Sequence, residues 1–245
     1  MIKSEDEVFV QMRRGMNVLF LGQGYLAIET GTDPFLSQIT QKYGAGPHPD
    51  YDAVFVGTAG QNVEQSLAWM DERCRRIPLP HWLNVVADFP WNAVFTSAID
   101  SVWPQAFVND WRTVQPIFLE RHIPNDPRNV FQLNCTFLFG SVSRTDPGER
   151  PPKSKFDWYS RKQSAVSLAR RIREVVTPMG GLFIEGYRGA KDWLKPEDLY
   201  APLSVLLPGQ VQLFSASASL VEDEFDLIGR RSRSAASRVV TGGPL

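Results

Sequence analysis

Short segments of glycines, carboxylates and hydroxyls in this chain form a pattern that could hold a nucleotide. Gly22-Gln23-Gly24 follows the apolar run at residues 18–21 and precedes a helix-like segment that starts at Tyr25. A buried strand, a tight glycine turn and a helix bring backbone N–H groups close to a pyrophosphate. The glycines leave room for the turn and for the phosphate. An ordinary tight turn between a strand and a helix gives the same pattern, so both interpretations stay open.

Further polar residues follow other expected strands. Residues 94–95 read as a central parallel strand that runs into a polar segment, and residues 180–187 read as a strand that enters a glycine turn. Ligands of open α/β sheets meet the residues just past the carboxyl ends of the strands. Asp33 could bond a ribose or could simply form an Asx turn before Pro34. The predicted nucleotide-binding residues are Gly22, Gln23, Gly24, Asp33, Ser97, Asp100, Gly186 and Tyr187.

The expected elements alternate between strands and helices, which predicts an α/β fold of the Rossmann-like type. Such a fold has a mostly parallel sheet with helices on both faces. Pro116 places its strand at an edge of the sheet, because proline cannot donate to the ladder. Strands are expected at 18–21, 94–95, 114–119, 130–136, 180–187 and 211–215, and helices at 4–14, 62–76, 160–176 and 193–207.

Composition narrows the class of protein. The 245 residues carry a formal net charge of −1, which gives no overall attraction to nucleic acid or to an anionic membrane. No apolar run approaches the length of a membrane span, and the acidic N-terminus lacks a signal-peptide core. Two cysteines, Cys74 and Cys135, fit a reducing cytoplasm. Together with three scattered histidines, they cannot make a four-ligand zinc site.

The C-terminal segment differs from the rest of the chain. Residues 230–245 contain four arginines and no acidic residue, which is typical of an unfolded linker. We therefore expect one domain over residues 1–215, and a linker or the start of a further domain over 216–245. The expected partners are other domains or subunits of a larger assembly, further copies of this chain included. Contact with nucleic acid is expected only through the arginine-rich tail.

The order of these segments resembles the sirtuin-type NAD-binding domain, in its bacterial defence-associated branch. That family has a Gly-Ala-Gly loop after its first strand, and here Leu21-Gly22-Gln23-Gly24 is similar, followed by residues 30–35. Its Thr-Thr-Asn-Tyr-Asp motif is similar to residues 96–100, and its Lys-Leu-His-Gly motif to residues 132–135. Its Phe-Val-Gly-Tyr-Ser motif is similar to residues 183–188, with Asp192 beyond. The resemblance spans residues 16–215 and implies binding of NAD or a related nucleotide.

The chain departs from the family at the positions that carry its chemistry. The resemblance places Ala98 where the family has the asparagine that holds the nicotinamide ribose and the attacking water. It places Asn134 where the family has the histidine that acts as general base. Alanine has no hydrogen-bonding side chain, and neutral asparagine cannot accept a proton near pH 7. His122 is the one conceivable substitute for the base, and a surface histidine is the simpler interpretation.

These departures leave three hypotheses open. The first is a catalytically degenerate sirtuin-like module that keeps the fold, binds a nucleotide, and serves assembly or sensing in a multidomain bacterial protein of antiphage-defence type. The second is an active NAD glycohydrolase, in which an acidic group, Asp100 or Asp33, stabilises an oxocarbenium-like transition state. The third is a scaffold whose nucleotide cleft is closed by Gln23 and Tyr25, which are larger than the family's residues at these positions.

Overall fold

The protein is built on a parallel sheet. The computed structural model describes residues 17–44, 50–126, 131–176, 180–203, 211–214 and 241–242, together with residues 10 and 129. Its strands lie in the order β3-β4-β2-β1-β5-β6-β7, and every neighbouring pair is parallel. This architecture confirms the predicted α/β, Rossmann-like fold. The strands are β1 (Asn17–Leu21), β2 (Trp91–Thr96), β3 (Thr113–Ile117), β4 (Gln132–Phe137), β5 (Leu182–Glu185), β6 (Val211–Phe214) and β7 (Thr241–Gly242).

Strand β1 lies at the centre because it is apolar along most of its length and buried throughout. Its last residue, Leu21, pairs with Thr96 of β2 on one side and with Glu185 of β5 on the other. From β1 the chain first builds the sheet outward through β2, β3 and β4, and then returns to the opposite side with β5. The segments that leave β1 and β5 therefore diverge, which makes the carboxyl ends of these two strands the topological switch point.

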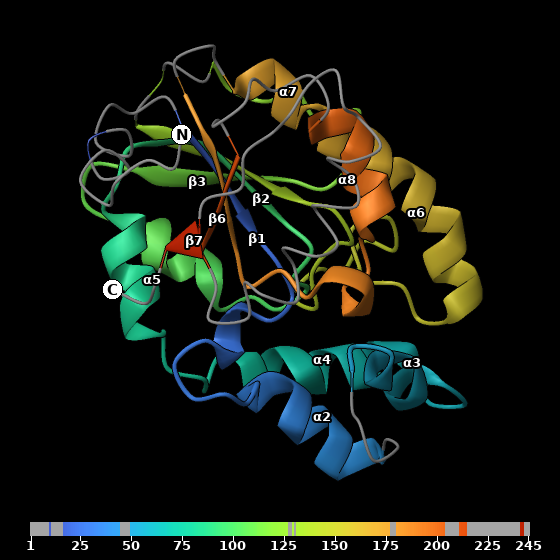
Figure 1. Ribbon diagram of the computed structural model, residues 1–245. Coiled ribbons are helices and arrows are strands. Elements are labelled where there is room, and N and C mark those ends of the chain that lie inside the picture. The colour runs from blue at the N-terminus through green and yellow to red at the C-terminus, as the bar shows by residue number, and fades with distance from the viewer. Residues whose placement is uncertain are drawn as a thin grey trace.

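The helices cover the sheet from two sides and also across one end (Figure 1). Helices α6, α7 and α8 lie together on one side, and α5 packs with η2 on the other. Local capping sets the start of several helices, since the side chains of Asp33, Asn62 and Ser154 accept from the first-turn amides of α2, α4 and α6. The helices are η1 (Tyr25–Ala27), α2 (Pro34–Tyr43), α3 (Ala53–Thr58), α4 (Val63–Cys74), α5 (His81–Ala87), η2 (Trp103–Phe107), α6 (Lys155–Arg170), α7 (Ile172–Val175), η3 (Gly189–Lys191) and α8 (Pro196–Leu203).

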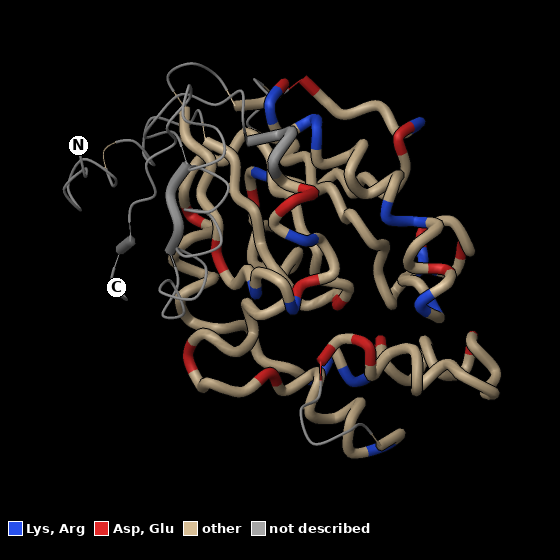
Figure 2. Tube along the Cα trace, turned by 45° about the vertical axis from the view of Figure 1, so that its right-hand side comes forward, with Lys and Arg blue, Asp and Glu red and all other residues tan. Residues whose placement is uncertain are grey.

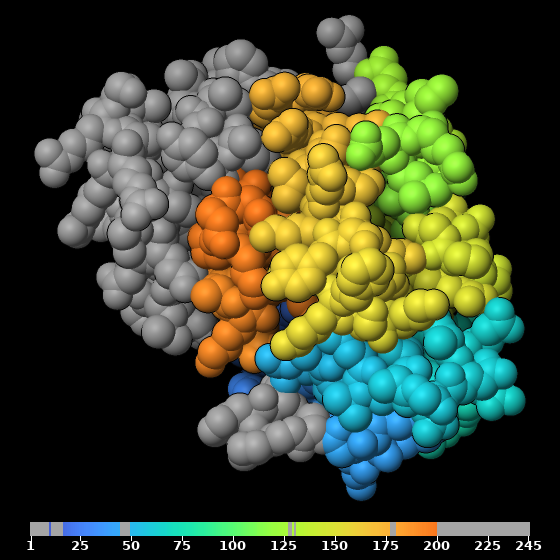
Figure 3. All heavy atoms as spheres, turned by 90° about the vertical axis from the view of Figure 1, so that its right-hand side faces the viewer, coloured from blue at the N-terminus to red at the C-terminus, as the bar shows by residue number. Residues whose placement is uncertain are grey.

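Helices α2, α3 and α4 form a separate helical layer at the end of the sheet where β1 terminates (Figure 1). The atoms of this layer meet those of the segment around α6 along one boundary (Figure 3). Two side-chain contacts join them there: Thr58 Oγ1 donates to the Lys153 carbonyl at 2.8 Å, and Lys155 pairs with Asp52 at 3.2 Å. The helical layer therefore lies at the carboxyl ends of the strands, which is where the sequence pattern predicts a nucleotide. We call this end of the sheet the sheet edge.

Several predicted elements differ from the structure. The helix expected from Tyr25 is only the three-residue η1, because the chain must turn at once into the helical layer. Helix α2 and helix α5 were not predicted; α2 begins with proline in a segment that reads as a turn. The helix expected at 160–176 begins earlier, as α6, and is interrupted at Arg171 before α7.

The two ends of the chain lie largely outside the described residues. The helix expected at 4–14 falls there, apart from residue 10, and so does most of the linker expected at 216–245. Within that linker, the two residues of β7 pair with β6 and extend the sheet. The 1–215 boundary stays a prediction.

The described surface carries charges of both signs. Basic and acidic residues are interspersed along the Cα trace, in keeping with the net charge of −1 (Figure 2). In the described ranges, no helix combines the length and the apolar character needed to traverse a lipid bilayer.

Candidate functional site

The glycine turn after β1 packs directly against the turn after β5. The amide of Gly22 donates to the Glu185 carbonyl, and the amide of Gly24 donates to the Gly186 carbonyl, each at 2.8 Å. Between them, the Gln23 amide donates to Asp192 Oδ2 at 3.1 Å. All three N–H groups of the turn are therefore bonded within the protein, and none is left to bind a phosphate.

The close approach of these two turns explains their glycines. A Cβ on Gly22 would lie 2.3 Å from the Tyr187 Cα, which is far closer than atoms can pack. Gly186 has φ +64°, and a Cβ there would lie 2.5 Å from the Tyr25 Cα. Backbone packing alone thus requires these glycines, as in the simpler of the two interpretations of the sequence.

The polar segment after β2 joins the same edge. The Ser97 amide donates to the Leu21 carbonyl at 3.1 Å, and the Thr96 hydroxyl donates to that carbonyl at 2.8 Å. Asp100 is fully buried, and its Oδ1 accepts from the Tyr25 hydroxyl at 2.5 Å and from the Val102 amide at 2.9 Å. Burial raises the pKa of Asp100 to about 6, although these two hydrogen bonds act in the opposite direction.

Asp33 has a structural role in the helical layer. Its Oδ1 accepts from the Phe35 and Leu36 amides at 2.9 and 3.0 Å and so caps α2. Its Oδ2 accepts from the Tyr51 hydroxyl at 2.7 Å. Burial raises the pKa of Asp33, and these bonds and the nearby Arg188 partly offset the rise. The helix cap and the Tyr51 hydroxyl together engage both oxygens of this carboxylate, so its role here is structural.

The structure brings the eight predicted nucleotide-binding residues to one edge of the sheet, with Asp33 contributed by the helical layer. Asp192 joins the first glycine turn to the segment after β5, since its carboxylate accepts from the Gln23 and Leu194 amides. Burial raises the pKa of Asp192, and these bonds partly offset the rise. Gln23, Ser97, Asp100 and Asp192 are each fully buried. The grouping was predictable from the sequence, but the internal hydrogen bonding of its members was not.

Asn134 does not lie at this edge, which corrects the sequence-based placement. It pairs with Ala93 inside the sheet, three positions before the pairing of Phe137 with Thr96, so it lies about 10 Å from the end of the strand. Its side chain exchanges two hydrogen bonds with the Asn125 backbone, at 2.9 and 2.8 Å. Asn134 therefore fastens the loop after β3 and takes no part in the site.

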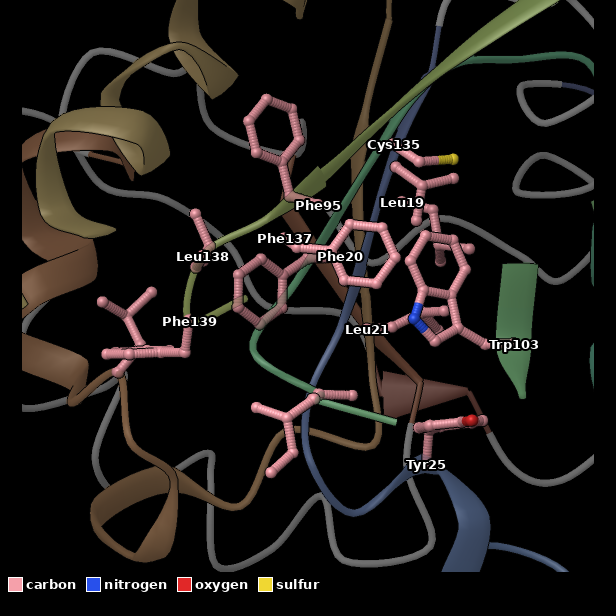
Figure 4. Packing of buried hydrophobic residues seen from close by; sticks show 14 of the residues in the cluster. Leu19, Phe20, Leu21, Tyr25, Phe95, Trp103, Cys135, Phe137, Leu138 and Phe139 are labelled. Atoms are coloured by element: carbon pink, nitrogen blue, oxygen red, sulfur yellow. The ribbon is translucent and has the colours of Figure 1, made fainter. Parts of the chain in front are cut away.

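The residues that do follow β4 at the edge are apolar. Leu138 donates its amide to the Thr96 carbonyl at 2.9 Å, and Phe139 comes next, before Gly140 with φ +80°. Figure 4 shows Phe139 and Tyr25 near the end of β1, on either side of the space below Leu21. Both side chains are buried, with at most 1% of their surface exposed.

Trp193 fills the boundary between the sheet edge and the helical layer. Its ring lies 5.6 Å from the Phe139 ring and 5.3 Å from the Phe55 ring, with which it is stacked at 3°. It also meets Tyr51 edge-on at 6.3 Å, and its Nε1 donates to Asp52 Oδ1 at 3.2 Å. We call Tyr51, Phe55, Phe139 and Trp193 the aromatic plug. Nothing in the sequence pattern indicated it, because its members come from three distant segments.

Some buried polar atoms in this region have no partner among the described residues. Both side-chain atoms of Gln23, Oε1 and Nε2, lack a hydrogen bond, and so does Asp100 Oδ2. Leaving such a group unpaired costs about 1–3 kcal/mol. These atoms mark the part of the structure with the greatest unmet capacity for hydrogen bonds.

Neither His122 nor the cysteines supply the missing chemistry. His122 Nδ1 accepts from the Phe118 amide at 3.3 Å, and its Nε2 lies 3.7 Å from Glu149, so it holds the loop after β3. Cys74 and Cys135 are free and buried, and burial raises the pKa of both thiols. Within the described part of the chain, no group of three or more His, Cys, Asp and Glu side chains could hold a metal ion.

Comparison with protein-family models finds no matching family, and comparison with curated proteins finds no significant match.

Proposed function

We propose that this chain is a sirtuin-like module that has lost catalysis and that serves assembly or sensing in a larger bacterial protein of the antiphage-defence type. The observation that carries the proposal is the apolar character of the edge after β4, where Phe139 packs against Trp193. The larger role rests on the resemblance of the sequence segments described above. NAD turnover is not part of the proposed function.

The structure changes which residue is compared with the family's histidine. Leu138-Phe139-Gly140 follows β4 directly, and its leucine and glycine match the Lys-Leu-His-Gly motif on either side of the histidine position. Phe139 then takes the place of the histidine, instead of Asn134. A phenyl ring can neither accept nor donate a proton, and loss of a general base typically costs 10²–10⁴-fold in rate.

Ala98 supports the same conclusion at the neighbouring strand. It is fully buried after β2, and its amide donates to the Thr96 hydroxyl at 2.9 Å, so no polar side chain is offered at this position. Both positions at which the resemblance requires polar chemistry therefore hold apolar residues. The residues present do not fit NAD in this conformation, because the turn amides are bonded internally and the plug fills the boundary.

The second candidate is an NAD glycohydrolase that uses Asp100, and one observation favours it. The Asp100 carboxyl is buried, has an unpaired Oδ2, and has a pKa of about 6, raised by burial. Such a group could stabilise an oxocarbenium-like transition state. Its hydrogen bond to Tyr25 at 2.5 Å places it behind that ring, however, and not on an open surface.

Incubation of the purified protein with NAD distinguishes the two candidates. We expect no release of nicotinamide above the rate in buffer, with Asp100→Asn as the matched variant. Steady turnover by the wild type that Asp100→Asn abolishes would establish the glycohydrolase and refute the proposed loss of catalysis.

A further inference from the structure

We infer that Trp193 is a built-in occupant of the cleft: its indole takes the place of the flat base of a nucleotide and keeps nucleotides out. The inference rests on the proposed function, since it concerns the same cleft, and it adds how that cleft is kept closed. The ligand class that it excludes is a nucleotide with a planar base and an anionic phosphate, as in ADP-ribose.

The surroundings of the indole are those that a protein offers to a base. One face of the ring stacks on Phe55 at 5.3 Å and 3°, and its edges meet Tyr51 and Phe139. Its N–H donates to the carboxylate of Asp52, which also pairs with Lys155. A purine could use the same surroundings as the indole. Its ring would stack on an aromatic side chain, and its ring or exocyclic N–H would donate to a carboxylate.

A second, independent observation is a buried amide side chain at the glycine turn with unmet capacity for hydrogen bonds. Gln23 is fully buried, and neither its Oε1 nor its Nε2 has a partner among the described residues. Its backbone amide donates to the carboxylate of Asp192, the residue directly before Trp193 in the chain. Hydroxyl groups of a ribose would satisfy an amide that the closed form leaves unpaired.

The glycine turn also has a cationic side chain beside it, that of Arg188. A Cβ on Gly24 would be 2.8 Å from Cγ of Arg188, so the Arg188 side chain runs along this turn. Arg188 takes part in none of the ion pairs found in the described ranges, although its charge lowers the pKa of Asp33. Arg188 is partly buried, and a guanidinium that forms no ion pair with a described residue is suited to a phosphate.

These contacts explain why the wild type should refuse a nucleotide. Trp193 has only 3% of its surface exposed, and a ligand must first remove the indole from its aromatic neighbours. The apparent affinity equals the intrinsic affinity multiplied by the fraction of molecules in which the ring has left, so a small open fraction gives weak binding. Shortening Trp193 removes this competition and leaves Asp52, Gln23 and Arg188 in place.

The test is titration calorimetry with ADP-ribose on wild type, Trp193→Ala and the matched control Trp103→Ala. Trp103 is also fully buried, so its replacement opens a space of the same size elsewhere in the core. We expect saturable binding only for Trp193→Ala, and at least a tenfold loss of that affinity in Trp193→Ala/Arg188→Ala. A folded Trp193→Ala protein that binds no ADP-ribose, or one whose binding ignores Arg188, overturns the inference.

Trp193→Leu serves if the alanine variant does not fold, because it keeps apolar contacts with Phe55 and Phe139 while removing the ring. We expect it to bind ADP-ribose measurably, and absence of binding counts against the inference. Nicotinamide release from NAD by either variant bears on the proposed function instead. The two claims can thus fail separately.

Discussion

Buried carboxyl groups gather at the carboxyl edge of this sheet, and each is held by different neighbours. Asp33, Asp100 and Asp192 accept hydrogen bonds from side chains or from several amides, which offsets part of the rise that burial imposes on their pKa values. The carboxyl of Glu185, which is partly exposed, accepts from the Gly186 amide at 3.0 Å and from no other donor in the described ranges. Burial therefore raises the pKa of Glu185 to about 8. Among these residues, Glu185 is the one whose charge is least accommodated.

The Glu185 carboxyl predicts a dependence of stability on pH. Its folded pKa of about 8 exceeds the value of 4.5 for the free side chain, so the folded protein binds the proton more tightly than the unfolded chain. The stability that this proton provides is complete below about pH 4.5 and is lost as the pH rises to about 8. We expect Glu185→Gln to remove this loss and to be more stable than the wild type at pH 8 by about 1–3 kcal/mol.

Urea unfolding between pH 5 and pH 9 measures this effect, and the exposed Glu197→Gln provides the control. The control should follow the wild-type profile. A Glu185→Gln protein with the same pH profile as the wild type would show that this carboxyl is not kept neutral in the folded state.

At the scale of the elements, the turn after β1 and the turn after β5 behave as one packed unit. The backbone of one turn occupies the space that a side chain on the other would need. A Cβ added to Gly22 would lie 2.3 Å from the Cα of Tyr187. We expect Gly22→Ala to lower the free energy of unfolding by more than about 3 kcal/mol, because backbone atoms cannot move aside as a flexible side chain can.

Gly31→Ala is the matched control for this prediction. Gly31 has φ +72°, and a Cβ added there would have no atom within 4 Å. Only the left-handed backbone therefore opposes alanine at this position, at a cost of about 1 kcal/mol. Equal losses of stability in the two variants, measured by urea unfolding, would mean that the two turns are not packed as described.

Local patterns predicted many of these elements, and their limits have physical causes. The apolar runs gave β1, β2 and β5, since a strand buried on both faces must be apolar. Helix α2 was not predicted because Asp33-Pro34 is typical both of a turn and of the capped start of a helix. The strand expected at 130–136 agrees with β4 to within two residues, but the motif comparison chose Asn134, which lies inside the strand and not past its end.

At the scale of the molecule, the helical layer and the sheet edge meet through aromatic rings. The plug joins α3 to the segments after β4 and β5, which are far apart in the chain. Sequence patterns describe one segment at a time, so they predicted the edge and its residues but could not show what fills the boundary. The aromatic plug fills the boundary, so the segments that resemble nucleotide-binding motifs form part of a closed interface between the two layers.

The boundary between the sheet edge and the helical layer should be closed to nucleotides in the wild-type protein. Titration calorimetry with ADP-ribose at up to about 1 mM measures this closure, since that range detects binding as weak as about −4 kcal/mol. We expect no saturable heat from the wild-type protein. Saturable binding by the wild type with a Kd below about 100 µM, about −5.5 kcal/mol, would mean that the aromatic plug does not keep nucleotides out.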